Sequence, residues 1–169
     1  PSTGNSILKV NDGILVNQGL EFTVKTHIIN KDNFFFDFGV NGEVLRNKLT
    51  QMPIDISTGQ RKIIDLATAG FGRVEGRSIY DYYMREYAGV NSATGAAQWY
   101  VNYVDNNGNG GFDAGEQITS LHEYQIQNPN ADIKTGTTEV FAQATQKFLG
   151  KSAIPDVRGA FNFDFGYKA

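Results

Sequence analysis

The sequence predicts an all-β fold built around a long antiparallel hairpin. Two observations support this prediction: apolar and polar residues alternate over two long neighbouring segments, and a third alternating segment lies at the C-terminal end. Because successive side chains of a strand point to opposite sides, each segment has one apolar face. The stretch between the second and third segments is rich in glycine, asparagine, aspartate, threonine and tyrosine, and it predicts a long loop region.

The first two predicted strands cover residues 14–29 and 34–48. In the first, the apolar face consists mainly of even-numbered residues: Ile14, Val16, Leu20, Phe22, Val24 and Ile28. In the second, the even-numbered residues are again apolar: Phe34, Phe36, Phe38, Val40 and Val44. The third predicted strand, residues 158–169, carries its apolar side chains on odd positions: Phe161, Phe163, Phe165 and Tyr167.

The turn between the first two strands determines how they pair. Their apolar faces lie on the same side of the hairpin only if even residues pair with even residues. That pairing requires a loop with an odd number of residues. We therefore expect a three-residue loop of Lys31, Asp32 and Asn33, with Asn33 in the left-handed conformation.

Length and periodicity favour different architectures. Each of the first two strands runs for about 14 residues, against about 5 to 6 in a typical globular sheet and about 9 to 11 for the part of a strand that crosses a bilayer. Length therefore favours a transmembrane β-barrel, whereas periodicity alone favours a soluble β-sandwich with its apolar faces inward. The strand pattern by itself leaves both architectures open.

Composition excludes several classes of protein. The chain has 169 residues, and 15 Lys and Arg against 18 Asp and Glu give a net charge of -3. The cations are scattered, so we expect no nucleic-acid partner. The absence of cysteine excludes a disulfide scaffold and a thiolate zinc site. His122-Glu123 begins like a zinc-protease motif, but Ile126 stands where the second histidine is needed, and we expect a protein that is not an enzyme.

The loop region contains one short motif that is typical of a calcium-binding loop. Residues 105–116 match the EF-hand pattern at every specified position, with Gly110 at the sharp turn. The spacing predicts a Ca2+ ion held by six residues: Asp105, Asn107, Asn109, Gly111, Asp113 and Glu116. Two neutral asparagine ligands predict a weak site, with a Kd on the order of 0.1 to 1 mM. The flanking residues do not predict the two helices of an EF-hand, so a plain polar turn is the alternative.

A second candidate site is a group of aromatic residues in the same loop region: Tyr80, Tyr82, Tyr83, Tyr87, Trp99 and Tyr100. Flat amphipathic rings stack on sugars or bury area against a protein partner, and they also form the cores of small subdomains. Both roles remain open for this group. Residues 138–149, followed by Gly150, predict a short helix.

Several short motifs follow one another along nearly the whole chain: Asn17-Gln18-Gly19-Leu20-Glu21-Phe22, Ile29-Asn30-Lys31-Asp32-Asn33-Phe34, Asn47-Lys48-Leu49-Thr50-Gln51-Met52-Pro53, Gly76-Arg77-Ser78-Ile79-Tyr80-Asp81-Tyr82-Tyr83, Tyr87-Ala88-Gly89-Val90-Asn91, Thr94-Gly95, Gln98-Trp99-Tyr100 and Gly150-Lys151-Ser152-Ala153-Ile154-Pro155. In this order they resemble the late barrel region of SusC/RagA-type TonB-linked outer-membrane transporters. Each motif is weak alone, and their order makes the resemblance specific. The resemblance favours the barrel over the sandwich.

The resemblance implies a segment of a transmembrane antiparallel β-barrel in the outer membrane. Residues 50–157 would then be an extracellular loop, the turn at Asp32 would be periplasmic, and the even-numbered faces would meet lipid. The family imports oligosaccharides or peptides with energy passed through TonB, and a SusD-type surface lipoprotein lids its barrel.

The resemblance also implies that the chain is a fragment. About three strands cannot close a barrel, because small barrels already need eight. The contact with TonB would then belong to parts of the protein outside this sequence. The alternative is a soluble extracellular β-sandwich that binds glycan or protein and uses calcium to stiffen a loop.

Overall fold

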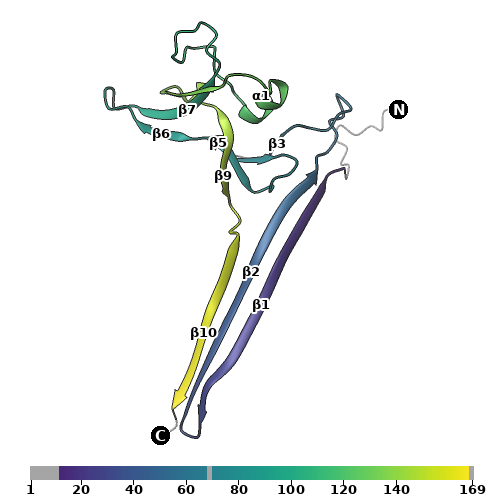
Figure 1. Cartoon of the computed structure of the whole chain (residues 1–169), viewed down its shortest axis with the longest axis vertical. Helices are drawn as coiled ribbons and strands as arrows, with labels where there is room; N and C mark the ends of the chain where they lie inside the picture. The colour runs from purple at the N-terminus through teal and green to yellow at the C-terminus, as the bar shows by residue number, and fades with distance from the viewer. Residues whose placement is uncertain (1–11, 68–69, 168–169) are drawn as a thin grey trace, which may run out of the picture.

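The computed structural model describes residues 12–67 and 70–167, which form an all-β protein. They contain three antiparallel sheets, one short α-helix (α1, Leu121–Gln127) and one turn of 3-10 helix (η1, Phe141–Gln143). Figure 1 shows a long three-stranded arm with a group of shorter strands, loops and α1 at its upper end. The prediction of an all-β fold is confirmed. No helix in these residues is long and apolar enough to cross a membrane.

The long arm is a sheet of three antiparallel strands in the order β1-β2-β10. β1 covers Ile14–Lys31, β2 covers Phe34–Gln51, and β10 covers Val157–Tyr167. The three segments expected to be strands form this sheet, and β1 and β2 run further than expected. The last two residues of the third predicted strand lie outside the described residues. β10 returns from the far end of the loop region, so β2 is the central strand.

The register places most of the large apolar residues of the three strands on one face of this sheet, although Leu15, Phe35, Leu45 and Leu49 lie on the other. Leu20 lies opposite Val44 in the β1–β2 pair, and Phe38 lies opposite Phe163 in the β2–β10 pair. Directly opposite residues share a face of an antiparallel sheet. The predicted pairing of even with even residues is therefore confirmed over the central part of the hairpin.

The turn of the hairpin differs from the prediction. Lys31 lies opposite Phe34, which leaves a two-residue turn of Asp32 and Asn33 instead of a three-residue loop. Asn33 is not left-handed, because no non-glycine residue in the described part of the chain has a positive φ. The physical reason is a register shift between His27 and Ile29. A two-residue turn by itself pairs odd with even residues, and one extra residue on β1 restores the pairing of even with even residues beyond the shift.

Two smaller sheets lie at the upper end of the arm, in the orders β3-β4-β5-β9 and β6-β7-β8. Their strands are β3 (Asp65–Ala67), β4 (Phe71–Arg73), β5 (Asp81–Arg85), β6 (Tyr87–Val90), β7 (Ala97–Tyr103), β8 (Lys134–Thr138) and β9 (Gln146–Ser152). The helix predicted over residues 138–149 is wrong. Its second part belongs to β9, which pairs with β5, and this tertiary pairing outweighs a weak local helix propensity.

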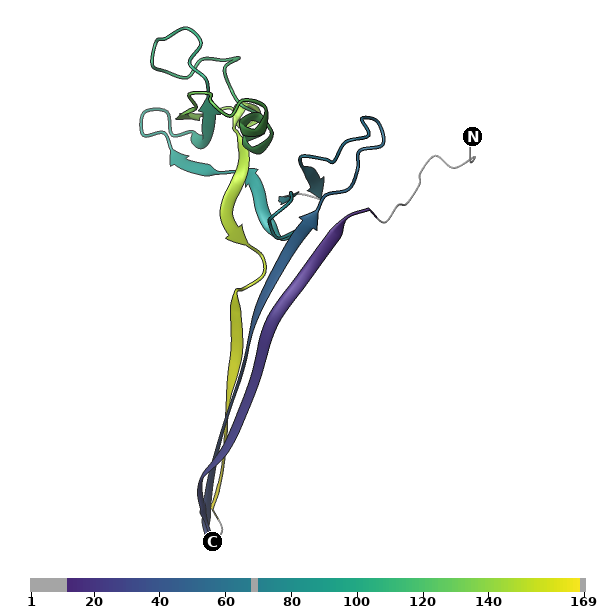
Figure 2. The same cartoon turned by 45° about the vertical axis from the view of Figure 1, so that its right-hand side comes forward.

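The buried core lies in the upper part of the molecule. Most of its apolar side chains come from the short strands and their connections: Met52, Val74, Tyr83, Val101, Tyr103, Ile118 and Ala144. Figure 2 shows the long sheet leaving this part as a thin arm. A sandwich needs two sheets face to face, and no second sheet among residues 12–67 and 70–167 packs on the arm. The described residues therefore do not form the alternative sandwich.

Two glycines of the long sheet test its register. A Cβ at Gly159 would lie 2.5 Å from the backbone oxygen of Asn41, whereas a Cβ at Gly39 would meet nothing closer than 3.6 Å. We expect Gly159→Ala to destabilise the folded protein by about 1 to 3 kcal/mol, because β10 must move away from β2.

The matched control is Gly39→Ala, which we expect to be neutral or slightly stabilising, since alanine loses less backbone entropy than glycine. The measurement is the midpoint of thermal unfolding. Equal destabilisation by the two substitutions would contradict the observed pairing of β10 with β2.

Candidate functional site

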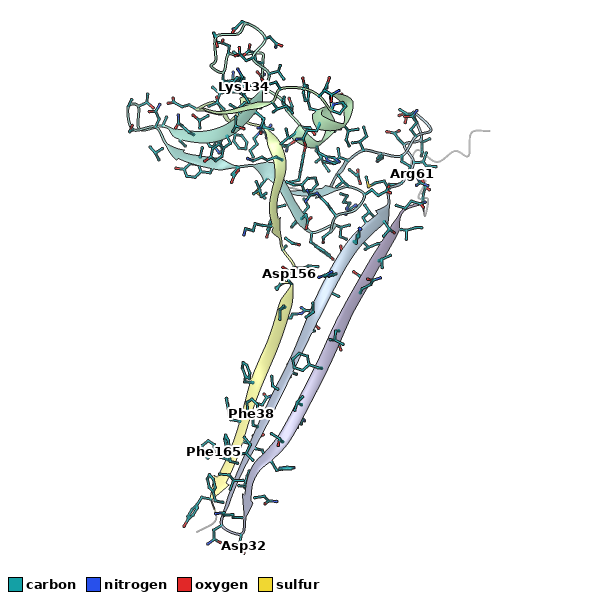
Figure 3. All side chains as sticks on the ribbon, viewed as in Figure 1. Asp32, Phe38, Arg61, Lys134, Asp156 and Phe165 are labelled. Carbon is teal, nitrogen blue, oxygen red and sulfur yellow. The ribbon has the colours of Figure 1, made fainter. Side chains whose placement is uncertain are left out.

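The long sheet exposes a continuous apolar face. Its strands contribute large apolar side chains that nothing in the described chain covers: Leu20, Phe22, Val24, Phe34, Val44, Val157, Phe161, Phe163, Phe165 and Tyr167. Rings stack across the strands, with centroids 6.3 Å apart for Phe36 and Phe163 and 6.2 Å apart for Phe38 and Phe161. Phe38 and Phe165 are labelled on the arm in Figure 3. Soluble monomers rarely expose so extended an apolar patch, which marks contact with lipid or another protein.

The opposite face of the same sheet is polar. His27 Nδ1 on β1 lies 2.7 Å from Asp37 Oδ1 on β2. Arg158 on β10 forms an ion pair with Glu43 on β2. These pairs link neighbouring strands on the side opposite Phe36 and Phe38, where Phe35 is the one phenylalanine of the described β2 and β10 residues, and this side is therefore mainly polar and charged.

The calcium-type loop, residues 105–116, begins at a carboxylate that is already well satisfied. Asp105 accepts hydrogen bonds from the backbone N–H groups of Gly108 at 2.7 Å and Gly110 at 2.9 Å. Gly110 has a φ of 82°, the left-handed conformation that a sharp turn requires. Lys134, at the start of β8, places its Nζ 2.7 Å from Asp105 Oδ2. A cation from this chain therefore lies against the first predicted calcium ligand.

Three other residues predicted as calcium ligands, Asn107, Asn109 and Asp113, have side chains in contact in this loop. Asp113 accepts hydrogen bonds from the side-chain amides of Asn107 at 2.8 Å and Asn109 at 2.5 Å. Glu116 accepts hydrogen bonds from the backbone N–H groups of Asn106 at 2.9 Å and Asp113 at 3.1 Å. In residues 12–67 and 70–167, no group of three or more His, Asp or Glu side chains is arranged to hold a metal ion. Calcium binding stays a prediction.

The ion pair between Lys134 and Asp105 stabilises the charged form of both groups. The hydrogen bond from Lys134 is the main cause that lowers the pKa of Asp105, and the N–H groups of Gly110 and Gly108 act in the same direction. The same hydrogen bond is the main cause that raises the pKa of Lys134. At neutral pH both groups are therefore charged, and the loop is held by an internal cation.

The predicted aromatic group does not form one surface. Tyr83 is buried in the core, with its hydroxyl 2.7 Å from Ser120 Oγ and its ring against Phe148. Tyr82 faces the other side of β5 and stacks on Phe71. Successive residues of a strand point to opposite sides, so Tyr82 and Tyr83 do not share a surface. Of the two roles that the sequence left open, Tyr83 has the structural one.

Trp99 belongs to a partly exposed aromatic cluster of Tyr87, Trp99 and Phe141. The ring of Trp99 lies edge-on to Tyr87, with centroids 6.5 Å apart, and to Phe141, with centroids 5.3 Å apart. The guanidinium carbon of Arg85 lies 4.7 Å from the ring centre of Phe141. Tyr87 is 56% exposed and Phe141 51%. Phe141 was not predicted to join this cluster, because it is remote from Trp99 along the chain and lies in a segment predicted to be helical.

Tyr80 and Tyr100 lie outside the aromatic cluster. Tyr100 follows Trp99 on β7 and faces the opposite side, where Lys147 Nζ lies 5.0 Å from its ring centre. Tyr80 is exposed just before β5 begins. Of the predicted aromatic group, the structure therefore brings only Tyr87 and Trp99 together.

An amphipathic sheet of long antiparallel strands, with a short turn at one end and a long connection at the other, has the architecture of a segment of barrel wall. Solved structures with the same fold include "Structure of the RagAB peptide transporter", at 21% identity and a TM-score of 0.58. "Structure of the RagAB peptide importer in the 'closed-closed' state" matches at 20% identity and a TM-score of 0.59, and the 'open-open' state at 18% and 0.54.

The matched region is most of this chain and a small part of those transporter chains. It covers 92% of this chain in all three comparisons, and 14%, 14% and 13% of the transporter chains. No protein-family model matches the chain, and no curated protein matches it either. The likeness therefore establishes a shared fold with one segment of a transporter.

The Lys134–Asp105 ion pair predicts how the loop responds to pH. The folded-state pKa of Asp105 is lower than its unfolded value, so its stabilising contribution is present above about pH 4 and is lost as the pH falls through the folded pKa. Lys134→Met removes the main cause of the lowered pKa, and we expect the loss to begin at a higher pH.

The measurement is hydrogen exchange at the amides of Gly108 and Gly110, which donate to Asp105. Lys151→Met, which removes an exposed lysine outside the loop, is the control and leaves the profile unchanged. An identical pH profile in the Lys134→Met variant would show that the ion pair does not hold the loop.

Proposed function

We propose that the chain is part of the barrel wall of an outer-membrane TonB-dependent importer of the SusC/RagA type. The observation that carries the proposal is the long sheet, which is apolar on one side and mainly polar on the other over its central part, from Leu20 to Val24 on β1 and from Phe36 to Val44 on β2. A barrel wall needs this arrangement, because one side meets lipid and the other meets the lumen. The fold shared with a segment of the RagAB peptide transporter supports the proposal.

The dimensions of the apolar face fit a membrane. From Phe34 to Val44 the apolar face of β2 is about 33 Å long, at roughly 3.3 Å per residue. A strand tilted by about 40° to the membrane normal turns this length into a height of about 25 Å, which is the height of the apolar band in outer-membrane barrels.

The two ends of the sheet would face different compartments. In outer-membrane barrels, short turns lie in the periplasm and long loops outside. The turn at Asp32 would then be periplasmic, and residues 50–157 would be extracellular. Figure 3 shows Asp32 and Lys134 at opposite ends of the molecule.

The loop region is the part that would contact the cargo and the partner. The cargo class is oligosaccharides or peptides, and the matched structures are described as a peptide transporter. The partner is a SusD-type surface lipoprotein, and we assign its contact to the aromatic cluster, which offers exposed rings beside a cation. TonB contact belongs to parts of the protein outside this sequence, and we propose no catalytic step.

A structural calcium site in the loop 105–116 is a further part of the proposal. The side chains of Asn107 and Asn109 lie within hydrogen-bond distance of Asp113, and the left-handed Gly110 makes the turn. Lys134 would have to leave Asp105 for the ion to bind, so its ammonium competes with the metal. This competition supports a Kd toward the weak end of the range, on the order of 1 mM.

The lipid-facing side of the sheet predicts a contrast between two adjacent residues. Phe36→Lys places a charge toward the bilayer and costs roughly 2 to 4 kcal/mol, whereas Asp37→Lys faces the lumen and costs little. We expect only Phe36→Lys to impair assembly of the complete polypeptide, measured as folded protein in the outer-membrane fraction. Equal tolerance of both substitutions would remove the barrel assignment.

The aromatic cluster predicts a site of partner binding. We expect Trp99→Ala to weaken binding of the surface lipoprotein by at least tenfold, because a central tryptophan packed between two rings buries a large apolar area. The control is Ile56→Ala, an exposed apolar residue in the connection between β2 and β3. The measurement is the affinity of the purified complex, and unchanged affinity in the Trp99→Ala variant would place the lipoprotein elsewhere.

The calcium proposal predicts opposite effects of two substitutions. Glu116→Gln removes the bidentate carboxylate and abolishes binding, whereas Lys134→Met removes the competing cation and tightens it. Asn106→Ala, at a position whose side chain is not a ligand, leaves the affinity unchanged. Calorimetry with CaCl2 on the complete polypeptide measures all three. A calcium concentration of 10 mM is on the order of ten times the expected Kd. If the unsubstituted protein binds no ion at that concentration, the calcium proposal is wrong.

A further inference from the structure

Two cations lie on the apolar face of the long sheet at its upper end. Arg46 and Lys48 continue the even-numbered positions of β2 beyond Val44, and both side chains are exposed. Arg46 lies opposite Gln18, and Lys48 lies opposite Val16. Because directly opposite residues share a face, both cations project from the side that carries Phe36 and Phe38.

Neither cation has an acidic partner in the described part of the chain. Arg158, on the other face of the sheet, pairs with Glu43, but the ion pairs of residues 12–67 and 70–167 include neither Arg46 nor Lys48. A groove of about 610 Å³ at the upper end of β2 is bordered by both cations and by acidic side chains, none of which lies within ion-pair distance of them. Two cations without an ion-pair partner at the edge of an apolar face favour an anionic partner.

Their height above the apolar band identifies that partner. Arg46 and Lys48 lie two and four residues beyond Val44, or about 7 and 13 Å along the strand. A tilt of about 40° reduces these lengths to about 5 and 10 Å along the membrane normal. The headgroup layer extends roughly 5 to 8 Å beyond the hydrocarbon core. The backbone at Arg46 therefore lies within this layer, and the backbone at Lys48 lies about 2 Å beyond its outer limit.

Building on the proposed function, we propose that Arg46 and Lys48 bind the phosphate groups of lipids in the leaflet on the loop side of the membrane. The guanidinium of Arg46 presents paired N–H donors that match two phosphate oxygens, and the ammonium of Lys48 acts as a point charge. Long cationic side chains keep their stems along apolar neighbours, here Val16 beside Lys48, while the charge reaches the headgroups. The pair would thus hold anionic lipid against the barrel and set its height in the bilayer.

The test uses the complete polypeptide, purified in non-ionic detergent, and native mass spectrometry. The probes are phosphorylated lipid A and the same lipid after enzymatic removal of its phosphates. We expect the unsubstituted protein to prefer the phosphorylated form. Arg46→Gln and Lys48→Gln each reduce that preference about fivefold, which corresponds to about 1 kcal/mol per cation near a membrane surface. Arg46→Lys keeps the charge and retains most of the preference.

Lys25→Gln is the matched control, because Lys25 is an exposed lysine on the polar face of the same sheet. We expect it to leave the preference unchanged. Retention of the full preference by the double variant Arg46→Gln/Lys48→Gln overturns the inference, and so does an equal loss in Lys25→Gln. Membrane insertion, measured first as heat-modifiable migration, separates the two proposals: an unsubstituted protein that does not insert refutes the barrel, whereas insertion with unchanged lipid preference refutes only the phosphate site.

Discussion

The pairing of even-numbered residues of β1 with even-numbered residues of β2 is the constraint on which the rest of the structure depends. A slip of one residue would move Phe34, Phe36 and Phe38 to the opposite side from the apolar residues of β1. The two-residue turn would impose such a slip, and the extra residue between His27 and Ile29 prevents it. β10 then follows the same register, with Phe165 opposite Phe36, so one irregularity near the turn keeps the apolar side chains of β1, β2 and β10 below Val44 on a common face.

This pairing gives the sheet one mainly apolar side and one mainly polar side. The aromatic stacks of β2 and β10 lie on one side, and the ion pair between Arg158 and Glu43 lies on the other. Burial of apolar area contributes roughly 25 cal/mol per Å², and the arm realises little of it within the described residues, since its large side chains stay exposed. The stability of the arm is therefore tied to what surrounds it, whereas the upper part has a core of its own.

The alternation of apolar and polar residues predicted the faces of the long strands, whereas features that depend on pairing between distant segments were not predicted. The faces of the long strands follow from alternation, and the spacing around Gly110 indicated which polar residues meet. The turn was missed because a bulge and an odd loop satisfy parity equally well. β9 was missed because its pairing with β5 comes from far along the chain. The same reason hid Phe141 beside Trp99, and composition alone did not separate the buried Tyr83 from its exposed neighbours.

Lys134 shows why a complete ligand spacing is not by itself a measure of metal affinity. It lies outside the motif, yet it takes up one oxygen of Asp105 and supplies the positive charge that the loop otherwise lacks. The backbone N–H groups of Gly108 and Gly110 already fix the turn at the same carboxylate: Gly108 donates to Oδ1, and Gly110 donates to Oδ2, the oxygen that Lys134 also contacts. An ion entering this loop would therefore replace an existing electrostatic partner more than it would create order. The free energy of calcium binding is reduced by the interaction between Lys134 and Asp105 that is lost. It is therefore smaller than at a site without a competing cation.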